Sequence, residues 1–338
     1  MKRYFGKYKD QDIYLYTIEN DKLKVEVSSL GATLVSLIYK PLDRDICLGY
    51  EDAETYADSH GSNMGATIGR CANRIAKGRF SLNGEEYHLT INNGPNTLHS
   101  GNENLANRVY DVHETEDALT LEALSEDGSD GFPGTLKVKI RYRLEDDSLV
   151  YAYEGTSDKD TLFNITNHAY FNLDGPSSTT ILDHELYIPT DYVGLVDSNG
   201  LATDGILDVK NTAFDFKRFK KIRDNLALGH DNINTAKGYD HPYIFNRDKG
   251  ELKAIFRNND LALEVSSDLP DMHFYTANYL DGEVKGKNGN YYIAKGGACF
   301  ECEYYPNAIN YTLFKKPILK ANELKSRYIR YRLSERKN

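Results

Sequence analysis

The stretch LKVKIRYRLEDDSLVYAY, residues 136–153, decides the fold class. From Leu136 to Leu144 apolar side chains alternate with lysines and arginines, a period of two that is typical of a β-strand with one buried face and one solvated face. After the polar residues 146–148 the alternation resumes through Tyr153. The stretch therefore predicts an antiparallel hairpin.

The same alternation recurs along the chain. It is seen at residues 23–27 and 261–265, and again at 80–82 and 87–89, where Asn83-Gly84 between the two runs favours a type I′ turn. Helical signals are thin by comparison, since only Phe216 to Leu228 and Asp52 to Ser59 could hold short helices. We therefore expect one all-β domain over residues 1–338, built from antiparallel sheets with few short helices.

Composition narrows the functional classes. The 338 residues carry 41 Lys and Arg against 51 Asp and Glu, a formal charge of −10, which disfavours binding to nucleic acid. No window approaches eighteen apolar residues and the first twenty residues contain no apolar stretch, so we expect neither a membrane span nor a secretory signal. Four cysteines are too few for a disulfide scaffold of this size. A cytoplasmic location is the resulting prediction.

The segment Phe163 to Leu173 has an unusual polar face. If it is extended, one face carries only neutral groups that donate and accept hydrogen bonds, namely Asn164, Thr166, His168, Tyr170 and Asn172. Such a ladder suits an uncharged ligand with many hydroxyl groups. The alternative, that these side chains pair with one another inside the protein, is about equally supported by this segment alone.

Other polar residues have ordinary explanations when each is taken singly. Glu301 and Glu303 share one face of an expected strand, where an exposed glutamate is the commoner case. Arg74 fits a surface ion pair, His99 a loop position and Asp240 a turn. Cys299 and Cys302 have zinc-like spacing but would point to opposite faces of a strand, and no second pair exists. We therefore expect no metal ion.

Taken together, several motifs change this interpretation. The chain resembles the aldose 1-epimerase, or galactose mutarotase, family, and the ordered segments that carry the resemblance are Gly65 to Ile75, Asn96 to His99, Thr166 to Leu173, Gly238 to His241 and Phe300 to Cys302. The resemblance runs over nearly the whole chain. It implies a β-supersandwich, in which two large antiparallel sheets pack face to face, in agreement with the alternation described above.

The resemblance also implies roles for individual residues. Glu301 looks like the general base and His168 like the general acid of a reaction that interconverts the α and β anomers of a free aldohexose, such as galactose or glucose. Arg74, His99 and Asp240 look like residues that orient the sugar, and Asn73 like a further contact. The partner so implied is a small monosaccharide, and neither a metal nor a cofactor is required. A His near its reference pKa and an ionised Glu would suit these roles.

The chain departs from the family pattern at two positions. His273 stands where the family commonly has a sugar-contacting Gln, and Glu303 stands where Gln is common. We therefore place His273 among the substrate-binding residues, while the preferred hexose and any contribution of Glu303 stay open. A monomer is the expected state, with a dimer as the alternative.

Two other functions stay open at this point. A sugar-binding or sugar-sensing protein on the same scaffold would bind sugars without accelerating any reaction. A glycoside-cleaving enzyme would need a second carboxylate facing Glu301 across the scissile bond, for which Asp240 is the obvious candidate.

Overall fold

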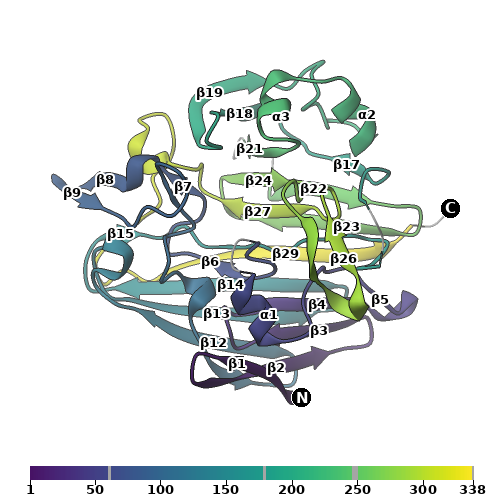
Figure 1. Cartoon of the computed structure of the whole chain (residues 1–338), viewed down its shortest axis with the longest axis horizontal. Helices are drawn as coiled ribbons and strands as arrows, with labels where there is room; N and C mark the ends of the chain where they lie inside the picture. The colour runs from purple at the N-terminus through teal and green to yellow at the C-terminus, as the bar shows by residue number, and fades with distance from the viewer. Residues whose placement is uncertain (60–61, 178–179, 246–249, 337–338) are drawn as a thin grey trace.

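The computed structural model describes residues 1–59, 62–177, 180–245 and 250–336. A nine-stranded antiparallel sheet forms its largest layer (Figure 1). In spatial order its strands are β11 (Asp111–Glu114), β12 (Ala118–Ser125), β13 (Leu136–Glu145), β14 (Ser148–Ser157), β29 (Lys325–Glu335), β23 (Leu261–Ser267), β22 (Leu252–Arg257), β17 (Glu185–Tyr187) and β20 (Lys220–Lys221).

Two five-stranded antiparallel sheets accompany it. The first consists of β1 (Lys2–Tyr8), β2 (Gln11–Glu19), β3 (Leu23–Ser28), β4 (Thr33–Tyr39) and β5 (Arg44–Asp45). The second, in spatial order, consists of β19 (Ala202–Asp208), β18 (Tyr192–Val196), β21 (Asp240–Ile244), β24 (Asp271–Tyr275) and β27 (Cys299–Glu303).

One hydrophobic core joins the three sheets. It contains Val138 and Tyr151 of the nine-stranded sheet, Leu37 of the first five-stranded sheet and Phe300 of the second. Phe171 connects the two smaller sheets, because its backbone pairs with Cys47 on one side and with Ala298 on the other. The expected face-to-face architecture is thus confirmed, with one of its layers divided into two sheets joined at Phe171.

The predicted hairpins are present. Strands β13 and β14 pair in register from Leu136 opposite Ser157 to Glu145 opposite Ser148. Strands β8 (Arg79–Leu82) and β9 (Glu85–His88) are joined by Asn83 and Gly84, whose φ angles of 54° and 85° are those of a type I′ turn. The local sequence therefore fixes these turns.

The described residues also contain short elements. The α-helices among them are α1 (Ala53–Asp58), α2 (Ile222–Ala227) and α3 (Asp231–Thr235). Helix α1 begins after Asp52, whose side chain accepts a hydrogen bond from Thr55 N. Further two-stranded pairs are β7 (Arg74–Ile75) with β10 (Thr97–Leu98), β6 (Thr67–Ile68) with β16 (Thr166–Asn167), β15 (Thr161–Leu162) with β28 (Ile318–Leu319), and β25 (Asp281–Lys285) with β26 (Tyr291–Ile293). None of the described helices has the length and apolar character needed to cross a bilayer.

For the polar segment 163–173 the sequence left two interpretations open, a face towards a ligand and internal pairing. The segment contains one short strand, β16, every residue in it is buried, and its side-chain amides pair inside the protein. Asn164 accepts from Tyr304 N at 2.8 Å, Asn167 donates to Gly65 O at 2.9 Å and Asn172 donates to Gly296 O at 2.9 Å. Internal pairing is therefore the correct interpretation for these three residues, because a segment between two sheets must satisfy its polar groups locally.

A buried arginine holds the loop that leads to the site. Arg70 is 2% exposed, and its guanidinium donates to six oxygens contributed by Ser125, Glu126, Pro133, Gly134 and Thr161. Burial lowers its pKa to about 10, so the group keeps its charge at neutral pH. Six acceptors arranged around two nitrogens fit the rigid fork of arginine and not the single ammonium of lysine.

We expect Arg70→Lys to lower the free energy of unfolding by about 2–4 kcal/mol, because several carbonyls lose their charged donor in a buried setting. Urea denaturation measures this change. Arg79→Lys, at an exposed position on β8, is the matched control and should change stability by less than about 0.5 kcal/mol. Equal stabilities of the two variants would show that the Arg70 network contributes little.

Candidate active site

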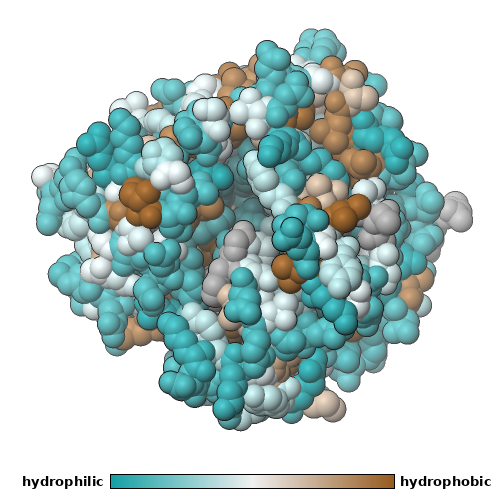
Figure 2. Space-filling view, in the orientation of Figure 1, coloured by the Kyte–Doolittle hydropathy of each residue, from teal (hydrophilic) through white to brown (hydrophobic). Residues whose placement is uncertain are grey.

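All seven residues predicted for the site line one cavity of about 100 Å³, and they are Asn73, Arg74, His99, His168, Asp240, His273 and Glu301. They come from segments that are far apart in the chain. The face of the molecule drawn in Figure 2 is hollowed near its centre, and mostly hydrophilic residues surround the hollow. The fold thus brings every predicted site residue together.

Strand register explains one half of the site. On neighbouring strands β24 and β27, His273 lies directly opposite Glu301, and Glu303 follows two residues later on the same face as Glu301. On the other side of β24, Pro242 of β21 lies opposite His273, so Asp240 is its diagonal neighbour. Diagonal neighbours lie within reach of long or aromatic side chains. Three adjacent strands therefore present one imidazole flanked by carboxylates.

Loops supply the other half. His168 follows β16, His99 follows β10, and Asn73 precedes β7. The backbone N–H of Asn73 donates to His99 Nδ1 at 3.1 Å, and the backbone N–H of His99 donates to Asn73 O at 3.1 Å. Both residues have positive φ angles, 63° and 51°, which cost energy for residues other than glycine and are typical of functional sites. This reciprocal pairing fixes the His99 ring.

The proposed acid and base lie side by side. His168 Nε2 is 3.6 Å from Glu301 Oε1, and both side chains are almost fully buried. The His168 ring stacks on Tyr170 with centroids 5.1 Å apart and meets the edge of His99 at 5.4 Å. Glu301 Oε2 is buried without a hydrogen-bond partner and is therefore available to a ligand.

The pKa values of Glu301 and His168 differ from those expected from the sequence, and burial is the main cause. It raises the pKa of Glu301 well above its ordinary value, further assisted by the charge of Asp240 and opposed by that of Arg74. It lowers the pKa of His168 to about 4. The expectation of near-reference values was therefore wrong, because burial disfavours the charged form of each group.

Asp240 behaves differently although it lies in the same cavity. Burial acts to raise its pKa, but the hydrogen bond from His273 and the charges of His273 and Arg74 outweigh burial and lower the pKa to about 2. His273 Nε2 is 2.6 Å from Asp240 Oδ1. Asp240 is consequently an ionised acceptor at neutral pH.

Glu303 lies behind the cavity and contacts this network. Its Oε1 accepts a hydrogen bond from Asn73 Nδ2 at 3.2 Å and is 4.0 Å from His273 Nδ1. Burial and the neighbouring Glu301 charge raise its pKa well above the ordinary value. Taken singly, Glu301 and Glu303 were expected to be exposed, but both are buried.

Arg74 is held at the edge of the cavity by its own partners. Its Nε donates to Asn93 Oδ1 at 3.0 Å and its Nη1 donates to Gly200 O at 3.1 Å. A Cβ at position 200 would lie 2.9 Å from the guanidinium carbon, and the positive φ of Gly200, 74°, favours glycine there. The guanidinium is thus fixed in orientation and keeps further donors for a ligand.

The site does not fit a metal ion well. His99, His168 and Glu301 could each offer one ligand atom, and these atoms lie within 4.8 Å of one another. However, His99 Nδ1 accepts the Asn73 N–H, so in the neutral ring Nε2 carries the hydrogen and has no lone pair to offer. Ligation by His99 would cost a buried backbone hydrogen bond.

Sequence reasoning did not place several cavity-lining residues in the site. Tyr170, Tyr275 and Tyr279 line the cavity, as do Asn63 and Leu98. Tyr170 was on the neutral polar face with His168, which was the available signal. Tyr279 lies in a loop after β24 and no pattern in the sequence distinguishes it from an ordinary exposed tyrosine.

Comparison with known proteins agrees with this geometry. Residues 14–332 match the family model for aldose 1-epimerase. A galactose mutarotase of Sus scrofa is 37% identical over 316 residues, which are 91% of this chain and 90% of that protein, and an aldose 1-epimerase of Escherichia coli is 35% identical over 91% and 90%.

Solved structures give the same result. An aldose epimerase homologue from C. elegans superimposes with a TM-score of 0.88 at 27% identity and covers 96% of this chain and 99% of its own. A galactose 1-epimerase from Lactobacillus acidophilus gives a TM-score of 0.87 at 29% identity, with 99% and 98% covered. Because the family match and the relatives above 30% identity both extend over most of the sequence, the chain belongs to the aldose 1-epimerase family.

Proposed function

We propose that this protein is an aldose 1-epimerase, an isomerase that interconverts the α and β anomers of free aldohexoses such as galactose and glucose. The observation that carries the proposal is the buried pair of Glu301 and His168, 3.6 Å apart in a cavity lined by hydrogen-bonding side chains. Relatives named galactose mutarotase and aldose 1-epimerase support it.

In the first half of the proposed reaction the pyranose ring opens. Glu301 removes the proton of the C1 hydroxyl while protonated His168 donates to the ring oxygen, so that the C1–O5 bond breaks and C1 becomes an aldehyde. Glu301 then carries the proton and His168 is neutral. Burial favours this uncharged form of the pair, as the raised pKa of Glu301 and the lowered pKa of His168 indicate.

The second half reverses these transfers after rotation about the C1–C2 bond. His168 takes the proton of the C5 hydroxyl as its oxygen attacks C1, and Glu301 returns its proton to the aldehyde oxygen. The pair starts and ends with one proton, so no other acid or base is consumed. The charge of Arg74 lowers the pKa of Glu301 and so favours the ion-pair form needed for ring opening. The charge of Asp240 raises the pKa of His168, which favours that form, and also raises the pKa of Glu301, which opposes it.

The remaining residues orient the sugar in this proposal. Asp240 accepts hydrogen bonds from sugar hydroxyls as a fixed carboxylate, while Arg74 and Asn73 donate to sugar oxygens. His99 presents its Nε2 hydrogen to the cavity because its Nδ1 is occupied. His273 holds Asp240 in place through the 2.6 Å contact.

A glycoside-cleaving function is less well supported. It requires one carboxyl group that is protonated and can protonate the leaving group. Asp240 is ionised at neutral pH because His273 lowers its pKa to about 2, and it shares a cavity of only about 100 Å³ with Glu301. The two residues therefore fit one sugar ring better than a scissile bond between two.

A cytoplasmic location is part of the proposal. All four cysteines, Cys47, Cys71, Cys299 and Cys302, are buried and unpaired. Unpaired thiols are typical of proteins in a reducing compartment.

Glu301→Gln should lower kcat for glucose and galactose by about 10²–10⁴, because an amide of the same shape cannot accept the proton of the C1 hydroxyl. Polarimetry on freshly dissolved α-anomers measures the rate, and Glu116→Gln, at an exposed position, is the control. Unchanged activity of Glu301→Gln would refute its role as base. Saturable sugar binding by the wild-type protein without any acceleration would instead support the sugar-binding alternative.

The pH dependence of kcat/KM should show a broad plateau around neutrality. Activity needs one proton shared between Glu301 and His168. Because burial lowers the pKa of His168 to about 4, a second proton should bind to the pair only as the pH falls towards 4. At high pH the raised pKa of Glu301 delays loss of the last proton. An acid limb near pH 6.5, the ordinary value for His, would contradict this account.

His273 and Glu303 should act as a coupled pair. We expect His273→Gln and Glu303→Gln each to raise KM severalfold, and the double variant to raise it by less than the product of the two effects. The reason is that the two side chains lie in contact and that contacting residues couple by about 0.5–3 kcal/mol. KM values for glucose and galactose in the four proteins test this, and strictly multiplicative effects would show that the residues act independently.

A further inference from the structure

His168 is contacted at both of its ring nitrogens. Nε2 is 3.6 Å from Glu301 Oε1, which belongs to the lining of the cavity, and Nδ1 is 3.7 Å from the sulfur of Cys299. Both partners of the second contact are buried, and that contact takes no part in the proton transfers of the proposed reaction. A thiol can donate a hydrogen bond or accept one, and the two arrangements place the hydrogen of a neutral imidazole on different nitrogens.

One strand holds the imidazole between two of its side chains. Cys299 and Glu301 lie two positions apart on β27 and therefore on the same face of the strand. Cys302 lies on the opposite face and packs in the hydrophobic core that joins the three sheets. The two cysteines with zinc-like spacing are thus separated, and Cys299 is the one that reaches His168.

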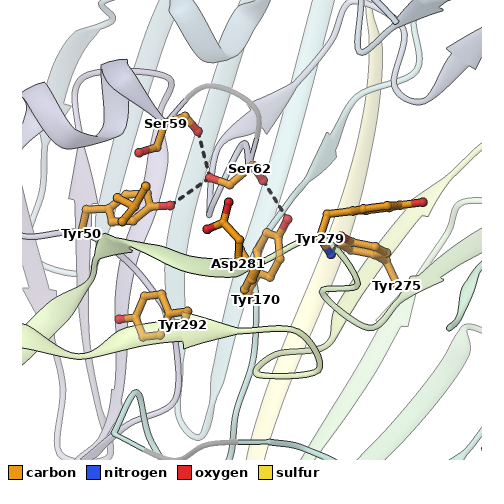
Figure 3. A pocket seen from close by; sticks show the side chains of 10 residues that line it. Tyr50, Ser59, Ser62, Tyr170, Tyr275, Tyr279, Asp281 and Tyr292 are labelled. Carbon is orange, nitrogen blue, oxygen red and sulfur yellow. Dashed lines mark hydrogen bonds between the residues drawn. The ribbon is translucent and has the colours of Figure 1, made fainter. Parts of the chain in front are cut away.

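Aromatic neighbours fix the plane of the His168 ring. Tyr170 stacks on this ring with centroids 5.1 Å apart, and Tyr275 lies edge-on to it with centroids 6.3 Å apart. Tyr170 is itself held, because its hydroxyl donates to Ser62 O at 2.8 Å (Figure 3). Ring packing does not distinguish the two tautomers of an imidazole, so the hydrogen-bond partners of its nitrogens decide between them.

Two acceptors are available to a hydrogen on Nδ1. The first is the backbone carbonyl of His168 itself: burial lowers the pKa of the ring, and a hydrogen bond to its own backbone opposes that shift. Covalent geometry lets an imidazole reach its own carbonyl only through Nδ1. The second acceptor is Cys299 Sγ, whose thiol stays neutral because burial and the charges of Glu301 and Asp240 raise its pKa well above the ordinary value.

The proposed reaction requires this position of the hydrogen. After ring opening His168 is neutral, and it must take the proton of the C5 hydroxyl when the ring closes again. Nε2 is the nitrogen that can do so, since Nδ1 faces Cys299. A neutral imidazole has a lone pair on Nε2 only when its hydrogen is on Nδ1. A thiol that donated to Nδ1 would place the hydrogen on Nε2 and prevent the step.

We propose, building on the proposed function, that Cys299 is a positioning residue for His168. Its sulfur accepts the hydrogen on Nδ1, together with the carbonyl of His168, and so keeps Nε2 as the atom that exchanges protons with the sugar. A neutral sulfur does this without the charge of a carboxylate, which would stabilise the imidazolium ion and weaken it as an acid. Cys299 itself exchanges no proton in the reaction.

The protonation of His168 also depends on the other groups around it. The titratable groups that face the ring or act on it through their charge are Glu301 of β27, His99 after β10, Tyr170 of its own segment, Tyr275 and His273 of β24, and Asp240 of β21. Variants at position 299 leave all of these groups in place.

Nitrogen-15 NMR of the full-length protein reads the tautomer directly. At pH 7 we expect His168, assigned by the loss of its signals in His168→Gln, to carry its hydrogen on Nδ1. In Cys299→Ala a larger share of the ring should carry it on Nε2, because one of the two acceptors at Nδ1 is gone. Cys302→Ala is the matched control: it removes a buried thiol from the other face of the same strand and should leave the His168 signals unchanged.

Polarimetry on freshly dissolved α-glucose measures the effect on the reaction. Cys299→Ala should lower kcat by about three- to tenfold, the loss expected from one hydrogen bond, and change KM by less than about twofold. Cys302→Ala should change kcat by less than about twofold. Circular dichroism at the assay temperature checks that both variants are folded, so that a lower kcat reflects the reaction and not a smaller amount of native protein.

A charge at the same position gives a second test. Cys299→Asp should raise the pKa of His168 and move the acid limb of kcat/KM, expected near pH 4, to higher pH by about 1–3 units, because an anion beside Nδ1 favours the imidazolium ion. Cys299→Asn has the same shape without the charge, so its acid limb should stay in place. Its carbonyl oxygen should also restore part of the kcat lost in Cys299→Ala.

The outcomes separate this inference from the proposed function. A wild-type His168 with its hydrogen on Nε2, equal effects of Cys299→Ala and Cys302→Ala, or an unmoved acid limb in Cys299→Asp would each overturn the role of Cys299 and leave the epimerase function intact. Absence of any catalysed equilibration by the wild-type protein would overturn the proposed function itself, whereas the tautomer of His168 is read without turnover.

Discussion

Two buried ionisable side chains dominate the chemistry of this structure. Glu301 and His168 lie 3.6 Å apart, and each is so buried that its charged form is disfavoured. A pair of this kind holds one proton over a wide pH range, because gaining a second proton or losing the only one creates a buried net charge. The proposed reaction needs a pair that passes one proton back and forth, and burial supplies this property without requiring either residue to titrate near neutrality.

The architecture explains why this pair can be buried. His168 lies in the segment that joins the two five-stranded sheets, where Phe171 pairs with both neighbours. Glu301 lies on β27, the edge strand of the second five-stranded sheet that pairs with β24. The joining segment therefore sets the imidazole beside the last strand of one sheet, and the nine-stranded sheet behind them closes the core. A polar group in such a position must find partners locally, which is why the neighbouring asparagines are occupied by backbone groups.

Much of the fold could be predicted from the sequence because its strands have one solvent-exposed face and one buried face. The alternation in β13 and the Asn83-Gly84 turn are local signals, and both were correct. The site residues were found through the resemblance to a family and not through local patterns, since Glu301 or His99 alone looks ordinary. What failed were statements about environment, namely the exposure expected for Glu303 taken singly and the pKa values of the acid–base pair. The internal pairing of Asn164 was one of two alternatives that the sequence left open. Each depends on which segments distant in sequence come to cover a residue, and periodicity carries no such information.

The two departures from the family pattern illustrate the same limit. In sequence, His273 and Glu303 are thirty positions apart and each looks like an isolated replacement of Gln. In the structure they are in contact, with Glu303 also bonded to Asn73 and His273 to Asp240. The imidazole of His273 can donate to Asp240 through one nitrogen while its other nitrogen faces the carboxyl group of Glu303. The carboxyl group of Glu303 lies 4.0 Å from that second nitrogen. A Gln at position 273 would have to make these two contacts with a different geometry. The replacement at 303 thus offers a partner for the replacement at 273, and the orientation of Asp240, which the sugar is proposed to meet directly, follows from both.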